Sequence, residues 1–336
     1  MRDRRGIGRY VRELVRRFAA ADDVTLTLLV DGPFPQFARP RFREMLGHDA
    51  FALARRVPKD SDVVWHPWNG TFLAGTAPSV ATIHDVVPFA YPDSDPRRRH
   101  SQQAPFLRSA AVSAAIVTDS AFSAGEIERL LGVTSDRIRP IPLGVGLPFE
   151  PGPATAALGP YILLVGSDEP HKNARPLVEG AARALEGRET RLAGLGPSLP
   201  GGPSFVPIPP AGEAELVGLY RGAAFLAAPG LYEGFGLPLL EAMACGTPVL
   251  AARSGPYPEV CGDAAAYVDE PRDPQAWAAA IATLLEDDAR RAQLRERGLR
   301  RAAEFTWDRT ARATLDVLRA HARPGAARAN ASAARN

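Results

Sequence analysis

The sequence has few of the residues that build disulfide frameworks and cysteine-based metal sites. Among its 336 residues it holds two cysteines, Cys245 and Cys261. Two cysteines are too few for a disulfide-stapled fold, and such usage fits a protein of a reducing compartment. A disulfide framework and a cysteine-based metal site are therefore excluded.

Long apolar runs and a large net charge are also missing. No run approaches the ~18 apolar residues of a membrane-spanning helix. The charged start, Met1 to Arg5, is followed by an amphipathic pattern rather than by the apolar segment of a secretory signal. The formal net charge of +2 gives no argument for nucleic acid binding.

These absences lead us to expect a cytoplasmic protein. The run Arg97–Arg99 and the arginines of the first predicted helix leave peripheral contact with the inner face of a membrane open. Charge runs of this kind more often form solvated faces.

What is present is the composition of a globular protein with room for two domains. Of its residues, 46% are hydrophobic and 23% are charged. Strand-like apolar runs alternate with helical patterns, and this alternation predicts an α/β fold with parallel sheets covered on both faces. The predicted strands cover residues 25–30, 63–65, 80–84, 115–118, 138–141, 161–165, 190–193, 204–206, 224–228, 247–251 and 265–268. The predicted helices cover residues 37–46, 98–112, 123–131, 174–185, 289–305 and 307–318, with a further helix capped by Asp273.

The segment 149–160 is rich in proline, glycine and alanine and is typical of an interdomain linker. We therefore predict one domain over residues 1–150 and a second over residues 151–305, followed by a helix at 306–320. The tail 323–336 has almost nothing to bury, and we expect it to be disordered.

The motif with the most chemical content runs from Glu233 to Glu241. It follows the predicted strand 224–228, passes through the glycine pair Gly234 and Gly236, and enters a helix whose first turn holds Pro238. A glycine turn that opens a helix presents backbone N–H groups to an anion. The carboxylates on either side do not bind phosphate, so we expect them to bind hydroxyls, and the motif indicates a sugar nucleotide. The alternative is that the glutamates are helix caps or solvated residues around a plain turn.

Other polar groups follow predicted strands, at the sheet edge where doubly wound folds bind ligands. His84 and Asp85 end one such strand. The segment Trp65–Gly70 ends another, and it either lines an acceptor side or is a loop packed by its two tryptophans. The turn Gly6-Ile7-Gly8-Arg9 opens a helix and is a second candidate phosphate site, although only five residues precede it where a strand is expected.

Together these motifs resemble those of the family-four retaining glycosyltransferases of the GT-B fold. The resemblance rests on residues 6–10, His84-Asp85, residues 169–173, residues 232–241 and residues 258–264, and it extends to about Arg319. It implies two Rossmann-like domains facing a cleft, with the donor held mainly by the C-terminal domain. It also implies that the last helix crosses back to the N-terminal domain. We expect that domain to lack its first strand, since only five residues precede Gly6; the alternative is that the turn at Gly6 serves something else.

The resemblance also implies roles for single residues. Glu233 would contact the transferred sugar, Glu241 the ribose hydroxyls, and Lys172 the diphosphate. His84 would hydrogen-bond the donor sugar, and Gly8 would bring the start of the first helix to the diphosphate. Ser167, His171 and the segment Gly234, Phe235, Gly236 and Leu237 complete the expected donor site.

The sequence departs from the family at two donor positions. Ser167 and His171 stand where members usually carry an arginine, so Lys172 would meet the diphosphate with help from Arg175, Arg9 or His171 itself. A charged His171 would make donor binding pH-sensitive.

The predicted function is transfer of a sugar, with mannose favoured, from a GDP- or UDP-sugar to a hydroxyl of a glycan or glycolipid. The resemblance implies a retaining reaction that needs no metal and no cofactor beyond the nucleotide sugar. The chief alternative is a catalytically degenerate sugar-nucleotide-binding protein. A glycosidase that uses Glu233 and Glu241 as its carboxyl pair is a weaker alternative, because the phosphate-type turn would then have no purpose. An epimerase on the same fold is a further alternative, weaker than the binding protein.

Overall fold

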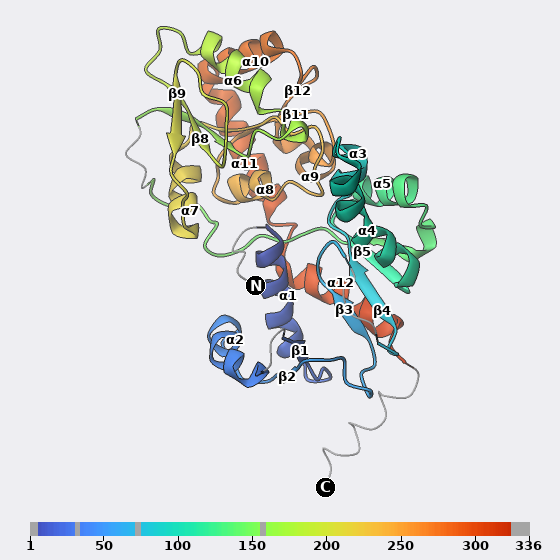
Figure 1. Cartoon of the computed structure of the whole chain (residues 1–336). Coiled ribbons are helices and arrows are strands. Elements are labelled where there is room, and N and C mark those ends of the chain that lie inside the picture. Colours follow the sequence, from blue (N-terminus) through green and yellow to red (C-terminus); the bar gives the residue numbers. More distant parts are fainter. Residues whose placement is uncertain (1–5, 31–33, 71–74, 155–158, 324–336) are drawn as a thin grey trace. The chain divides into compact units, whose positions relative to one another are not determined.

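The computed structural model describes residues 6–30, 34–70, 75–154 and 159–323 (Figure 1). These residues fall into two compact units. Unit 1 comprises residues 1–119, 123–143 and 307–336, and unit 2 comprises residues 120–122 and 144–306. Almost all of the tail predicted to be disordered, and part of the predicted linker, lie outside the described residues.

Unit 1 contains two parallel sheets. The larger has the strand order β3-β4-β5-β6, and the smaller pairs β1 with β2. Its strands are β1 (Thr27–Leu29), β2 (Ala52–Ala54), β3 (Val64–His66), β4 (Ser79–Thr82), β5 (Ala115–Thr118) and β6 (Ile138–Pro140). Its helices are α1 (Gly6–Ala19), η1 (Pro35–Ala38), α2 (Arg39–Leu46), α3 (Val87–Ala90), α4 (Pro96–Val112), α5 (Ala121–Leu131), η2 (Ser135–Arg137) and α12 (Trp307–Ala320), the first residues of α5 grouping with unit 2.

Helices α1 and α12 pack against each other inside unit 1. The apolar face of α1 is buried as its spacing predicts, with Tyr10, Leu14 and Phe18 almost fully enclosed. Thr310 of α12 donates to the carbonyl of Pro142 at 2.8 Å. Residues 1–5 lie outside the described part of the chain, so the expected absence of a first strand stays a prediction.

Unit 2 is built on one six-stranded parallel sheet with the order β12-β11-β10-β7-β8-β9. Its strands are β7 (Tyr161–Val165), β8 (Arg191–Leu195), β9 (Phe205–Ile208), β10 (Leu226–Ala228), β11 (Val249–Ala252) and β12 (Ala266–Val268). Its helices are η3 (Pro170–Lys172), α6 (Ala174–Ala184), α7 (Glu213–Gly222), α8 (Leu237–Ala244), α9 (Tyr257–Cys261), η4 (Gly262–Ala264), α10 (Pro274–Glu286) and α11 (Asp288–Ala302).

The predicted alternation is confirmed in both units, since each predicted strand and helix has its counterpart within a few residues. Asp273 caps α10 by accepting from the backbone of Gln275 at 2.8 Å, as its position before a proline indicates. Seven elements were not predicted: β2, α3, α7, α9 and the short helices η2, η3 and η4. α3 and α9 have four and five residues, too few for a helical period to develop. β2 differs from the predicted three-residue strands in having no buried residue.

The central strands of unit 2 are buried along their whole length, so β10 and β11 read as continuous apolar runs. The carboxyl ends of β7 and β10 lead into the two loops of the predicted donor site. In the part of the chain that is described, no helix combines the length and the apolarity needed to cross a bilayer.

Candidate functional site

The loop after β10 turns into α8 as the sequence predicts. Gly236 precedes the helix with φ of 100°, and Pro238 occupies its first turn. Gly246 follows the helix with φ of 77°. Such a left-handed backbone favours glycine at both ends, and a proline in the first turn loses no helical hydrogen bond. The N-terminus of α8 therefore presents the anion-binding geometry that the motif indicates.

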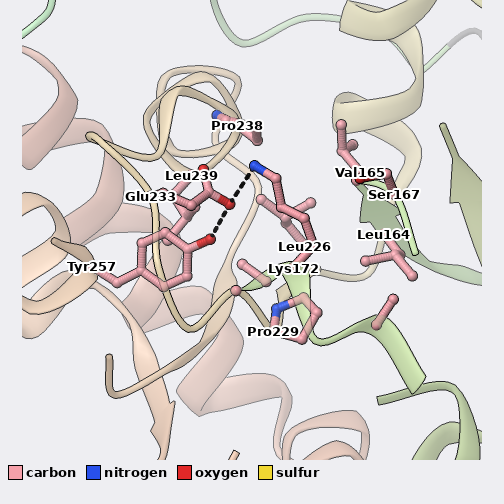
Figure 2. Close-up of a pocket in the computed structure, with 14 residues that line it drawn as sticks. Leu164, Val165, Ser167, Lys172, Leu226, Pro229, Glu233, Pro238, Leu239 and Tyr257 are labelled. Atoms are coloured by element: carbon pink, nitrogen blue, oxygen red, sulfur yellow. Dashed lines mark hydrogen bonds and ion pairs between the residues drawn. The ribbon is translucent and has the colours of Figure 1, made fainter. Parts of the chain in front are cut away.

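A pocket in unit 2 brings the loops after β7 and β10 together (Figure 2). Lys172 Nζ lies 3.3 Å from Glu233 Oε1, and the hydroxyl of Tyr257 donates to the same oxygen at 2.7 Å. The cavity beside this cluster measures about 20 Å³, room for about one water molecule. The pocket is lined by Leu164, Val165, Gly166, Ser167, Lys172, Ala174, Leu226, Ala228, Pro229, Gly230, Glu233, Pro238, Leu239 and Tyr257.

The ion pair in this pocket consists of one group that can bind an anion and one that can bind hydroxyls. The side chains of Lys172 and Glu233 are 29% and 18% exposed, so solvent screens their attraction only in part. The ammonium can bind an anionic group, and the carboxylate can accept from sugar hydroxyls. An anionic ligand would compete with Glu233 for the ammonium.

The remaining predicted residues of the first loop lie around Lys172. Ser167 lines the pocket and donates to Glu169 Oε2 at 2.9 Å. His171 is buried, and its carbonyl accepts from the N–H of Leu231 at 2.8 Å. Its Nε2 lies 3.9 Å from Glu169 Oε2, and His171 is not among the residues that line the pocket. Arg175 forms an ion pair with Asp168.

The two glutamates of the motif have different surroundings. Glu241 is buried in α8, where the hydroxyl of Tyr220 donates to its Oε2 at 2.9 Å. Glu241 does not line the pocket that holds Glu233. A glycosidase needs both carboxylates on one sugar, so this arrangement disfavours the hydrolase alternative.

The segment between the glutamates is fixed mainly through its backbone and its aromatic ring. The carbonyl of Gly234 accepts from Ser120 Oγ at 2.6 Å. The ring of Phe235 is buried and packs edge-on against Phe305, with centroids 5.8 Å apart. Leu237 is the first residue of α8. The side chain of Phe235 thus anchors the loop.

The predicted residues of unit 1 occupy a separate buried cluster. His84 Nδ1 lies 2.8 Å from Asp119 Oδ2, and Nε2 lies 3.1 Å from the carbonyl of Pro67. A carbonyl can only accept, so Nε2 carries a proton. Both ring nitrogens are therefore engaged within unit 1, and a hydrogen bond to a donor sugar would need one of them to be released. Gly8 is buried in α1 of the same unit.

The His84–Asp119 pair should make stability fall as the pH rises. Burial, the largest effect, lowers the pKa of His84, but Asp119, the carbonyl of Pro67 and Asp85 together outweigh it, so the pKa of His84 is raised above 6.5. Burial also raises the pKa of Asp119 despite the nearby imidazole. Both groups hold protons more tightly in the folded state, so their contribution is fully present below the unfolded pKa values and is lost as the pH rises through the folded ones.

We therefore expect the Tm difference between the wild-type protein and His84→Gln to be largest near pH 6 and to shrink toward about pH 9. Thermal unfolding across this range measures it. His100→Gln, which alters an exposed residue of α4, is the control and should leave the pH profile unchanged. A Tm difference that is constant with pH would contradict the expectation.

Sequence reasoning missed several residues of these clusters. Tyr257 lies in a short helix between prolines, where no pattern marks it. Asp119 follows β5 directly, and its position at a carboxyl strand end could have singled it out. Glu259 lies in the motif 258–264, but its contact was not predicted: it accepts from the N–H groups of Ala121 and Phe122 at 2.8 and 3.1 Å. Within the described ranges, no three His, Cys, Asp or Glu side chains gather as a metal site would require.

Two known families match this chain. Residues 4–147 match the family described as "Glycosyltransferase Family 4", and residues 208–301 match the one described as "Glycosyl transferases group 1".

Among curated proteins, the chain is 30% identical to the O-antigen chain mannosyltransferase B of Escherichia coli. The match covers 94% of this chain and 96% of that protein. The chain is also 33% identical to the MMP alpha-(1->4)-mannosyltransferase of Mycolicibacterium hassiacum, with 60% of this chain and 53% of that protein covered.

Solved structures of other proteins have a fold similar to that of this chain. WaaG, a glycosyltransferase involved in lipopolysaccharide biosynthesis, is 17% identical, with a TM-score of 0.68 over 93% of this chain and 96% of that one. HepE from Anabaena, in complex with UDP and glucose, is 15% identical, with a TM-score of 0.68 over 95% and 97% of the two chains. These similarities confirm the predicted GT-B fold class with its two Rossmann-like domains.

Proposed function

The chain belongs to the family-four, group 1 glycosyltransferases, and from this premise we propose that it transfers mannose from a nucleotide sugar to a hydroxyl of a glycan or lipid-linked acceptor. The proposal rests on the ion pair between Lys172 and Glu233, which line one pocket in the unit that also contains the N-terminus of α8. An ammonium and a helix N-terminus suit a diphosphate, and a carboxylate suits sugar hydroxyls.

In the proposed reaction, the bond between the sugar and the nucleoside diphosphate breaks, and negative charge grows on the leaving phosphate. Lys172 exchanges its contact with Glu233 for the diphosphate and stabilises that charge, together with the backbone N–H groups at the start of α8. Glu233, released from the ammonium, holds the hydroxyls of the sugar near the reacting carbon.

Glu241 would accept from the ribose hydroxyls of the donor. Its carboxylate is already fixed by Tyr220, so little ordering is left for ligand binding. The distinct surroundings of Glu233 and Glu241 support distinct roles for the two ends of one donor.

We propose that the transfer retains the anomeric configuration and needs no metal ion. In a front-face substitution, the leaving phosphate accepts the proton of the acceptor hydroxyl while the new bond forms on the same face. Lys172 and α8 supply positive charge where other enzymes use a divalent cation, so EDTA should leave the rate unchanged.

Mannose is proposed because two relatives are named mannosyltransferases, one of them matched along nearly its whole length. A GDP-sugar is therefore the first donor to test, with UDP-sugars as the comparison. The acceptor class proposed is a surface polysaccharide or its lipid-linked precursor, reached from the cytoplasmic side of the membrane.

A thermal-shift panel followed by a turnover assay tests the proposal. GDP-mannose at 100 times its dissociation constant should stabilise the protein by about 2.7 kcal/mol, and UDP-glucose and ADP-glucose should stabilise it less. The donor that stabilises the protein is then incubated with and without oligosaccharide acceptors, and the anomeric configuration of the product is read by NMR. Stabilisation by a UDP-sugar alone would overturn the choice of mannose. Binding without turnover would indicate a degenerate binding protein, and no stabilisation by any sugar nucleotide would overturn the proposal.

A further inference from the structure

Each glutamate of the motif is held by a tyrosine hydroxyl from a different element. Tyr257 of α9 donates to Glu233 Oε1 at 2.7 Å, and Tyr220 of α7 donates to Glu241 Oε2 at 2.9 Å. Both tyrosines are buried. The two carboxylates therefore have separate supports, and each support can be removed without touching the other.

The ring of Tyr257 fits a space made by two glycines of the loop between β10 and α8. A Cβ on Gly230 would lie 2.5 Å from the Tyr257 hydroxyl oxygen, and a Cβ on Gly236 would lie 2.9 Å from a ring carbon. The loop thus packs directly onto this ring, which leaves the phenol little freedom to move. Burial and the Glu233 carboxylate hold the pKa of Tyr257 well above its usual range, so the hydroxyl stays protonated and donates.

Tyr257 and Lys172 share one carboxylate oxygen of Glu233. Within the described residues, no further hydrogen bond reaches Glu233, so Oε2 is the oxygen available for a ligand. If Lys172 turns to an anion, Glu233 loses its ionic contact but keeps the hydroxyl of Tyr257. The phenol is then the group that keeps the carboxylate in place during the reaction.

Tyr220 holds Glu241 as Tyr257 holds Glu233, and Tyr220 is itself fixed by two further contacts. Its backbone carbonyl accepts from Thr247 Oγ1 at 2.6 Å, and its ring packs edge-on against Phe149 with centroids 6.2 Å apart. Glu241 does not line the pocket of Lys172 and Glu233. Loss of this hydrogen bond should therefore affect donor binding more than the chemical step.

We propose that Tyr257 is a positioning residue for Glu233 and sets the rate of sugar transfer through that carboxylate. The inference rests on the proposed function, since it assigns a role to a neighbour of the proposed sugar-binding carboxylate. Tyr257→Phe is the direct test, because it keeps the ring between Gly230 and Gly236 and removes only the hydroxyl. A hydrogen bond to a charged group is lost, so kcat should fall on the order of tenfold or more, while KM for the donor changes by less than about twofold.

Tyr220→Phe is the matched control, since it removes the same group from the other glutamate. It should raise KM for the donor and leave kcat within about twofold. Both variants should keep their Tm within about 3 °C of the wild type, because the rings remain and only one hydroxyl is lost. A fall of kcat in both variants to the same extent would mean general loosening of the site and would overturn the specific role of Tyr257.

A double-mutant cycle distinguishes action through Glu233 from a direct or structural role. In a Glu233→Gln background, the further change Tyr257→Phe should lower kcat much less than it does in the wild type. Equal losses in the two backgrounds would overturn the proposal. An unchanged kcat in Tyr257→Phe, with an active wild-type enzyme, would overturn the proposal while leaving the proposed function intact. An inactive wild type with every donor would instead count against the proposed function.

Discussion

Replacing Lys172 with alanine should lower kcat/KM for the nucleotide-sugar donor by about 10²- to 10³-fold, the size of effect seen when one preorganised charge-stabilising group is removed. Lys172 Nζ lies in the same pocket as Glu233, 3.3 Å from its carboxylate, and we propose that it stabilises the leaving diphosphate. Most of the loss should fall on kcat, because negative charge on the phosphate grows in the transition state. Steady-state release of nucleoside diphosphate measures both constants.

Arg175→Ala provides the control for Lys172→Ala. Arg175 is the next cation along the chain, but its side chain is 70% exposed and paired with Asp168. Exposed ion pairs contribute little, so kcat/KM should change less than about threefold. A loss as large as that of Lys172→Ala would show that Arg175 also meets the diphosphate. Full activity of Lys172→Ala would contradict the assigned role of the pocket.

Replacing Gly196 with alanine should lower the free energy of unfolding of unit 2 by about 4 kcal/mol or more, which places it among the most damaging single substitutions. Gly196 follows β8 with φ of 148°, and a Cβ there would lie 1.6 Å from the carbonyl oxygen of Gly166. The neighbouring backbone bond, from Gly166 N–H to the carbonyl of Leu195 at 3.0 Å, would have to break or stretch. The Tm should drop by about 8–16 °C.

Gly166→Ala is the control, because it changes the other glycine of this contact without a clash. A Cβ on Gly166 meets no atom within 4 Å, so its stability should stay within about 0.5 kcal/mol of the wild type. Differential scanning calorimetry of the two variants gives the comparison. Equal Tm values for Gly196→Ala and the wild type would show that the ends of β7 and β8 can separate at little cost, contrary to this packing.

The sequence predicted the central strands of unit 2 well because they are buried on both faces. Continuous apolar runs such as Tyr161–Val165 have no other stable place in a globular protein, and flanking glycines mark where they end. The start of α8 was equally clear, because Pro238 and Gly236 have narrow conformational preferences. β2 was missed although β3 and β10, of the same length, were predicted, and it differs from them in having no buried residue.

Within the candidate site, residue types and spacing pointed to Lys172 and Glu233 but could not show that they form an ion pair. Tyr257 was missed because its relation to Glu233 depends on how α9 packs against the loop after β10, and that relation has no local pattern. His84 was found by its place after β4, yet its partner Asp119 lies 35 residues further on, at the end of the neighbouring strand. The order of strands in the sheet decides which distant residues meet, and local sequence patterns do not give that order.

The placement of α12 has a consequence for how the protein is made. Unit 1 takes its last helix from residues 307–320, which leave the ribosome after the whole of unit 2 has been synthesised. At about 5–20 residues per second, the apolar surface of α1 that α12 covers stays without its partner for roughly 15–60 seconds. Unit 2 can therefore complete its core first, and the unit that begins the chain is the last to be finished.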